Sequence, residues 1–172
     1  MPTNVEIKAK VADPEALKHR IASLADGPAE TLFQEDTFFR VTTGRLKLRL
    51  ISCGRGELIY YERDDSLGPR PSRYELAKID EPASLLRVLT LGLGVRAVVR
   101  KRRLLYRRGP TRIHLDEVEG LGSFLELEVE MRPGEEKEAG DAIARDLMAS
   151  LGVEERDLVT VAYIDLLEER PG

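Results

Sequence analysis

The residues best suited to chemistry in this chain are charged side chains that alternate with apolar ones. Bases occupy every second position within residues 44–51, and acids do so within residues 123–131. The members are Arg45, Lys47 and Arg49 in the first segment, and Glu126, Glu128 and Glu130 in the second. Because side chains two residues apart share one face of a strand, each pattern predicts a strand with one apolar face and one face of a single charge.

Three further segments, within residues 4–11, 95–106 and 111–118, carry charges at alternate positions in the same way. Their charged side chains are Glu6 and Lys8, then Lys101 and Arg103, then Arg112, His114 and Asp116. An antiparallel sheet can expose a polar face to water, but solvated faces usually mix the two signs of charge. We therefore favour a curved sheet whose polar faces converge on a wet cavity while its apolar faces pack against helices.

The two signs of charge predict two kinds of ligand. Lysines and arginines from several strands suit a chain of phosphates, since each side chain offers several donors to phosphate oxygens. Carboxylates without histidine or cysteine partners select hard cations such as Mg²⁺ or Mn²⁺, which favour oxygen ligands. Positioning, positive charge and a metal ion supply most of what phosphoryl transfer requires. We interpret His114 as polar filler beside Asp116 and Arg112 rather than as a general base.

Composition excludes several classes of protein. The chain has 172 residues, of which 42% are apolar and 34% charged, and its net charge is -4. These values predict one folded domain over residues 1–172. Two histidines and one cysteine argue against a structural zinc cluster. A single cysteine cannot form an internal disulfide, which favours a reducing compartment such as the cytoplasm. No apolar run approaches the roughly 18 residues of a membrane helix. The acidic balance and few aromatic residues argue against a nucleic-acid partner.

The order of elements predicts an α+β fold dominated by antiparallel hairpins. Strands are expected over residues 4–11, 32–41, 44–51, 56–63, 73–79, 95–106, 111–118 and 123–131, with a loop over residues 64–72. Two helices are expected to begin where an acid precedes a proline, at Asp13-Pro14 and Glu81-Pro82. A third helix is expected over residues 135–151, and a short helical stretch around residues 158–167.

Several of these segments resemble, in order, the motifs of the CYTH group of triphosphate tunnel metalloenzymes. Residues 4–8 (NVEIK) resemble its ExExK motif, residues 34–39 (QEDTFF) its Q-x-D-x-Y/F-F strand, residues 46–49 (LKLR) its L-R-L-R strand, and residues 99–103 (VRKRR) its V-x-K-x-R strand. The most specific match is residues 114–128 (HLDEVEGLGSFLELE), which resemble L-D-x-V-x-G-L-G-x-F-x-E-x-E. Residues 162–167 (AYIDLL) resemble the closing S-Y-x-D-L-L, and Arg73 with Glu75 resemble an R-x-E pair.

The resemblance implies an eight-stranded antiparallel closed β-tunnel, or barrel, with helices packed outside, whose interior binds a triphosphate with Mg²⁺ or Mn²⁺. The implied metal ligands are Glu6, Glu126 and Glu128, with Asp116 near them either as a further ligand or as a carboxylate behind the ligands. The implied phosphate contacts are Lys8, Lys47, Arg49, Arg63, Arg73, Lys101, Arg103 and Arg112. Among these, the implied catalytic residues are Glu6, Lys8, Lys101 and Arg112.

The resemblance also implies an enzyme that cleaves a triphosphate. The reaction would be that of a class IV adenylyl cyclase on ATP, or that of a triphosphatase on inorganic, thiamine or nucleoside triphosphate. Asn4 stands where the first glutamate of ExExK is expected, so an alternative is a nucleotide- or polyphosphate-binding module with weak catalysis. A homodimer is possible, since homodimers are the commonest oligomers.

Overall fold

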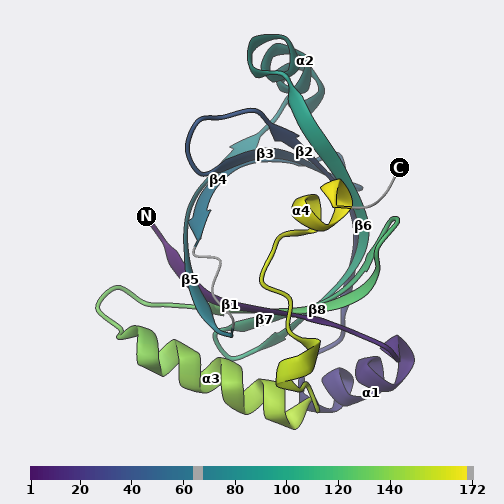
Figure 1. The fold of residues 1–172 in the computed structure, drawn as a ribbon, viewed down its shortest axis with the longest axis vertical. Coiled ribbons are helices and arrows are strands. Elements are labelled where there is room, and N and C mark those ends of the chain that lie inside the picture. The colour runs from purple at the N-terminus through teal and green to yellow at the C-terminus, as the bar shows by residue number, and fades with distance from the viewer. Residues whose placement is uncertain (64–67, 170–172) are drawn as a thin grey trace.

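The computed structural model describes residues 1–63 and 68–169, and eight strands of this part form one closed antiparallel barrel (Figure 1). The order of strands around the barrel is β1-β5-β4-β3-β2-β6-β7-β8. Their bounds are β1 (Thr3–Lys10), β2 (Glu30–Phe39), β3 (Arg45–Ile51), β4 (Gly56–Arg63), β5 (Arg70–Ile79), β6 (Val95–Arg108), β7 (Thr111–Val118) and β8 (Gly122–Glu130). The expected fold class is confirmed.

The helices of the described residues lie mostly outside this barrel. They are α1 (Pro14–Leu24), α2 (Pro82–Leu93), α3 (Lys137–Ser150) and α4 (Tyr163–Glu168), with a short 3₁₀ turn at Glu155–Asp157. At the start of α1 the Asp13 side chain accepts a hydrogen bond from the Ala16 amide, and Pro14 occupies the first turn, as the sequence predicts. None of these helices has both the length and the apolar character needed to cross a bilayer.

The barrel carries its apolar core on the outside. Figure 1 shows α1 and α3 side by side beneath the strands β1, β7 and β8. The core between these layers is made of buried aliphatic side chains from both. They include Ile7, Ile113 and Leu127 from the strands, Leu17 and Ile21 from α1, and Leu147 from α3. Because alternate side chains on each strand point the other way, burial of these residues turns the charged faces into the barrel.

The chain after α3 crosses one end of the barrel. In this segment, the prediction of a helix over residues 158–167 is only partly right. Residues 158–162 are not helical, and α4 begins only at Tyr163. Val159 donates its amide to the carbonyl of Lys8 at 2.9 Å, and Leu158 forms a β-bridge with Ala9. This half of β1 has no β5 neighbour, because their pairing ends at Glu6. The tail therefore supplies the missing strand partner.

The predicted loop over residues 64–72 is too long at its end, because β5 already begins at Arg70. Within the described residues, Pro71 pairs with β1, and the pairing of β5 with β4 reaches as far as Ser72. This places the proline at the first positions of its strand, where a residue without an amide proton is tolerated. Residues 64–67 of the predicted loop lie outside the described residues.

The close packing of α3 on β1 predicts a stability effect at Gly140. A methyl group placed on Gly140 would lie 2.5 Å from Met131 Sδ and 2.7 Å from Val5 Cγ2. We expect Gly140→Ala to lower the free energy of unfolding by about 1–3 kcal/mol through overpacking. The control is Gly92→Ala in α2, where no atom lies within 4 Å and a gain of up to about 1 kcal/mol is expected. Urea denaturation measures both, and stabilisation by Gly140→Ala would contradict the packing.

Candidate functional site

The barrel encloses a cavity of about 360 Å³, lined by side chains from all eight strands and by Tyr163 of α4. Although the whole chain has a net charge of -4, the described residues that line the cavity include nine bases and six acids. The volume lies within the range of small-molecule sites, and the charge favours an anion.

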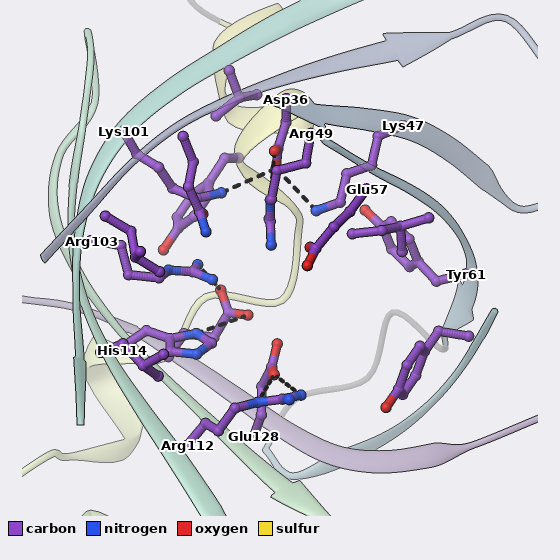
Figure 2. Close-up of a pocket in the computed structure, with 18 of the residues that line it drawn as sticks. Asp36, Lys47, Arg49, Glu57, Tyr61, Lys101, Arg103, Arg112, His114 and Glu128 are labelled. Carbon is purple, nitrogen blue, oxygen red and sulfur yellow. Dashed lines mark hydrogen bonds and ion pairs between the residues drawn. The ribbon is translucent and has the colours of Figure 1, made fainter. Parts of the chain in front are cut away.

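One wall of the cavity is built around the carboxylate of Asp36 on β2, which is only 1% exposed (Figure 2). Arg49 of β3 donates to both Asp36 oxygens, at 2.7 and 2.8 Å, and Lys47 donates at 3.0 Å. Lys101 of β6 donates from the other side at 3.2 Å. Burial alone would raise the pKa of Asp36, but the three cations hold it well below its usual range.

Asp36, Lys47, Arg49, Lys101 and Arg103 make up this wall, which we call the basic wall. Because its cations are crowded together, the charged form of Lys101 is disfavoured. Burial lowers the pKa of Lys101 to about 7, and the positive charges of Arg103, Arg49 and Lys47 act in the same direction against Asp36. One carboxylate cannot neutralise so many neighbours. An anion entering the cavity would therefore meet donors that lack a full set of negative partners.

The opposite wall carries Glu6 of β1 with Glu126 and Glu128 of β8, and we call these three the acidic wall. Glu6 is the register partner of Glu128, which brings the two carboxylates together. Burial and the charges of Glu128 and Glu126 raise the pKa of Glu6 to about 7, although Arg63 and Lys8 oppose this shift. Ligand atoms of His114, Glu126 and Glu128 lie within 4.8 Å of one another. This excess of close oxygen donors fits a divalent cation.

The closed strand order places the part of the basic wall on β2 and β3 opposite the acidic wall, whereas Arg103 of β6 reaches to within 3.9 Å of Glu126. β3 lies four positions from β8 in either direction around the barrel, and β2 lies four positions from β1. Figure 2 shows the same division, with Asp36, Lys47 and Arg49 on one side and Glu128 on the other. The cavity thus has cations on one side and carboxylates on the other.

The comparisons with known proteins agree with this geometry. A family model described as the CYTH domain matches residues 2–163. The chain belongs to the CYTH domain family. It is 26% identical over 171 residues to a protein of Methanocaldococcus jannaschii named "Putative adenylate cyclase MJ0240", covering 94% of this chain and 97% of that one.

Two solved structures show the same fold as this CYTH domain. The PH1012 protein of Pyrococcus horikoshii OT3 is 28% identical, with a TM-score of 0.84 over 95% of this chain and 98% of that chain. HpAC1 of Hippeastrum, described as an adenylyl cyclase candidate with a dominant triphosphatase activity, is 18% identical. Its TM-score is 0.68 over 98% of this chain and 95% of that chain.

Most residues that sequence analysis singled out in this CYTH domain line the cavity. Besides the members of the two walls already described, they are Lys8, Arg63 and Arg112. Lys8 Nζ lies 4.0 Å from the centre of the Tyr163 ring, and burial lowers the pKa of this lysine to about 8. Arg112 Nη2 pairs with Glu128 at 2.7 Å, and Arg63 Nη1 lies 3.8 Å from Glu6. These three bases lie beside the glutamates of the acidic wall.

The structure places two of the expected site residues away from the surface of the cavity. Arg73 lies outside the barrel with 63% of its side chain exposed and pairs with Glu62, because Ser72 and Tyr74 take the inward positions of β5. Asp116 is buried behind Arg103 instead of lining the cavity. Both Asp116 oxygens accept from Arg103 at 2.7 Å, and the Tyr163 hydroxyl donates to one of them. Asp116 therefore fixes the direction of Arg103 rather than offering a free oxygen to a metal.

Sequence analysis missed the part that Asp36 plays and missed Arg70 altogether. Asp36 stands in a motif that was recognised, and its alternation with Gln34 and Phe38 could have placed it inside. Its three partners could not be foreseen, since they come from two other strands. Arg70 fell within a predicted loop, whereas it begins β5 and donates to the carbonyl of Thr160 in the tail.

The arrangement around Asp36 predicts a large loss of stability in Asp36→Asn. The substitution leaves Lys47, Arg49 and Lys101 buried together without their shared negative charge. We expect the free energy of unfolding to fall by about 3–5 kcal/mol, as for other buried pairs that lose one partner. The neighbouring control, Glu35→Gln, removes an exposed pair with Arg100 and should cost less than about 1 kcal/mol. Equal losses in urea denaturation would contradict the central role of Asp36.

Proposed function

We propose that this CYTH protein is a divalent-metal-dependent enzyme that binds a triphosphate inside the barrel and cleaves it. The observation that carries the proposal is the cluster of Lys47, Arg49 and Lys101 on Asp36, which faces the three glutamates of the acidic wall across the cavity. A polyphosphate accompanied by a cation matches both walls at once. An anion without a cation, or a free metal ion, would match only one wall.

The basic wall would bind the phosphate oxygens and hold them in place. Arg103 is fixed by two hydrogen bonds to Asp116, and Arg49 by two to Asp36, so neither guanidinium must be ordered when the substrate arrives. Lys47 and Lys101 each keep donors beyond the one directed to Asp36. Donors placed in advance stabilise the charge that develops on phosphate oxygens during transfer.

The acidic wall would hold the divalent cation, Mg²⁺ or Mn²⁺, through Glu126 and Glu128 with Glu6 beside them. When bound, this cation supplies positive charge to the phosphate oxygens and lowers the barrier to displacement at phosphorus. Arg112 holds one Glu128 oxygen and so orients that carboxylate toward the cavity. Lys8 lies in register with Glu126 and balances its charge.

Two reactions are compatible with this site, and they differ in the attacking group. Attack of water on the γ-phosphorus releases orthophosphate and leaves a diphosphate, which makes the protein a triphosphatase on tripolyphosphate, thiamine triphosphate or ATP. Attack of the ribose 3′-hydroxyl of ATP on the α-phosphorus releases diphosphate and forms cyclic AMP. The first is the activity named for HpAC1, and the second is the one in the name of the M. jannaschii protein.

A binding module with weak catalysis is the second candidate, and Asn4 is the observation that favours it. Its side chain lines the cavity, is 3% exposed, and lies in register with Glu130 and Ser72. An amide here provides no negative charge for a cation. Tight metal-dependent binding of tripolyphosphate or ATP without any product would support this candidate over the enzyme.

The proposal predicts that Glu126→Gln removes activity without removing the phosphate site. With Mg²⁺ or Mn²⁺ present, release of phosphate, diphosphate or cyclic AMP from ATP, thiamine triphosphate and tripolyphosphate should fall by about a hundredfold or more. Binding of tripolyphosphate in EDTA should stay within about threefold, since the basic wall is intact. The control is Glu117→Gln on the outside of the barrel, 70% exposed, which should keep full activity. Unchanged product formation by Glu126→Gln would overturn the assignment.

The low pKa of Lys101 predicts that metal-free binding of tripolyphosphate takes up protons. With a pKa of about 7, Lys101 is mostly neutral at pH 8.5, and a bound anion favours its charged form. Affinity should therefore fall as the pH rises from 7 to 9. Lys101→Arg keeps its charge throughout and should take up fewer protons, by up to about one per binding event. Calorimetry in EDTA, in two buffers of different ionisation enthalpy, measures this number, and equal uptake in both proteins would contradict the role of Lys101.

A further inference from the structure

His114 on β7 is a buried side chain that the proposed function does not use. It is 3% exposed and lines the cavity beside the acidic wall. Its Nδ1 has no hydrogen-bond partner among the described residues, and the Oε1 atom of Glu126 lies 4.0 Å away. An imidazole that served only as polar filler would have a donor or acceptor on this buried nitrogen. The sequence-based interpretation of His114 as filler therefore does not account for its surroundings.

The strand register places this nitrogen where two carboxylates meet. His114 pairs across the sheet with Glu126, and Arg112, two residues earlier, pairs with Glu128. Inward positions two apart on β7 and β8 therefore form one compact group. One ligand atom from each of His114, Glu126 and Glu128 lies within 4.8 Å of the other two. Metal–ligand bonds of about 2.2 Å separate opposite ligands by about 4.4 Å and adjacent ligands by about 3.1 Å, so side-chain shifts of up to about 2 Å bring the three atoms around one ion.

The other charged contacts of this group leave ligand atoms available. Arg112 donates to Oε2 of Glu128, and no hydrogen bond within the described residues engages Oε1. The ion-pair contacts of Glu126 are to Arg103 Nη2 at 3.9 Å and to His114 at 4.0 Å, both longer than a hydrogen bond. Figure 2 shows the His114 ring facing the same part of the cavity as Arg103 and Glu128.

We propose that His114 supplies a ring nitrogen to the metal ion held by Glu126 and Glu128, so that the site prefers a transition-metal ion such as Mn²⁺ or Co²⁺ over Mg²⁺. The inference rests on the proposed function for the location of the ion, and adds a ligand and a selectivity to it. Imidazole favours first-row transition metals, whereas Mg²⁺ prefers oxygen ligands alone. A site with one nitrogen and two carboxylates combines both preferences.

The direct test is pulsed electron paramagnetic resonance of Mn²⁺ bound to the untagged full-length protein, with and without tripolyphosphate. Coordination by imidazole gives modulation from a ¹⁴N nucleus, and a site made of oxygen ligands does not. The chain has two histidines, so exposed His19 provides the matched control. We expect ¹⁴N modulation in the wild type and in His19→Gln, and its loss in His114→Gln and His114→Asn. Circular dichroism confirms that each variant is folded. The wild-type spectrum alone decides whether a nitrogen ligand binds Mn²⁺, even if a variant fails to fold.

Metal affinities give a second readout. We expect His114→Gln to weaken Mn²⁺ and Co²⁺ binding by about tenfold or more, and Mg²⁺ binding by less than about threefold. Bound Mn²⁺ without ¹⁴N modulation, or equal weakening for all three ions, would overturn the role of His114 while leaving the proposed enzyme intact. Failure of the wild type to bind any of the three ions, with or without tripolyphosphate, would overturn the proposed function as well.

Discussion

The structure depends on one buried carboxylate that holds three buried cations together. Asp36 is almost fully enclosed, and Lys47, Arg49 and Lys101 could not share the interior of a barrel without it, because desolvated like charges repel strongly. The arrangement is incomplete by itself, since one negative charge serves three positive ones. That imbalance is what prepares the cavity for an anion. Asp116 plays a comparable part for Arg103, with the hydroxyl of Tyr163 as an additional donor.

The rest of the fold follows from keeping these charges inside. The apolar faces of β1, β6, β7 and β8 must then be covered from outside, which α1 and α3 do. One end of the barrel is crossed by the tail, which pairs with the unpartnered half of β1 before α4 brings Tyr163 against Lys8 and Asp116. Closure of the barrel brings the acidic wall opposite the basic one. The chain thus places charged motifs that are scattered over its sequence around one cavity.

Local alternation was enough to predict the strands and the α+β class, and the resemblance to the CYTH motifs supplied most of the residues expected inside the barrel. The predictions failed where a second strand or a buried partner decides the outcome. Arg73 was expected inside, but a one-residue difference in register turns a side chain to the other face. Asp116 stands at an alternate position of β7 whose side chain should point into the barrel. It is buried behind Arg103 of the neighbouring strand β6, which the pattern of β7 alone does not reveal. Residues 158–162 follow the open edge of β1, which no local pattern reveals.

The central claim is that one ligand is held between the basic wall and the acidic wall. The most direct measurement is the anomalous diffraction of crystals grown with Mn²⁺ and tripolyphosphate. The account predicts an anomalous Mn²⁺ peak beside Glu126 and Glu128, with phosphate groups contacting Lys47, Arg49, Lys101 and Arg103. A Mn²⁺ peak remote from these glutamates, or tripolyphosphate bound only to exterior arginines such as Arg100 and Arg102, would contradict it.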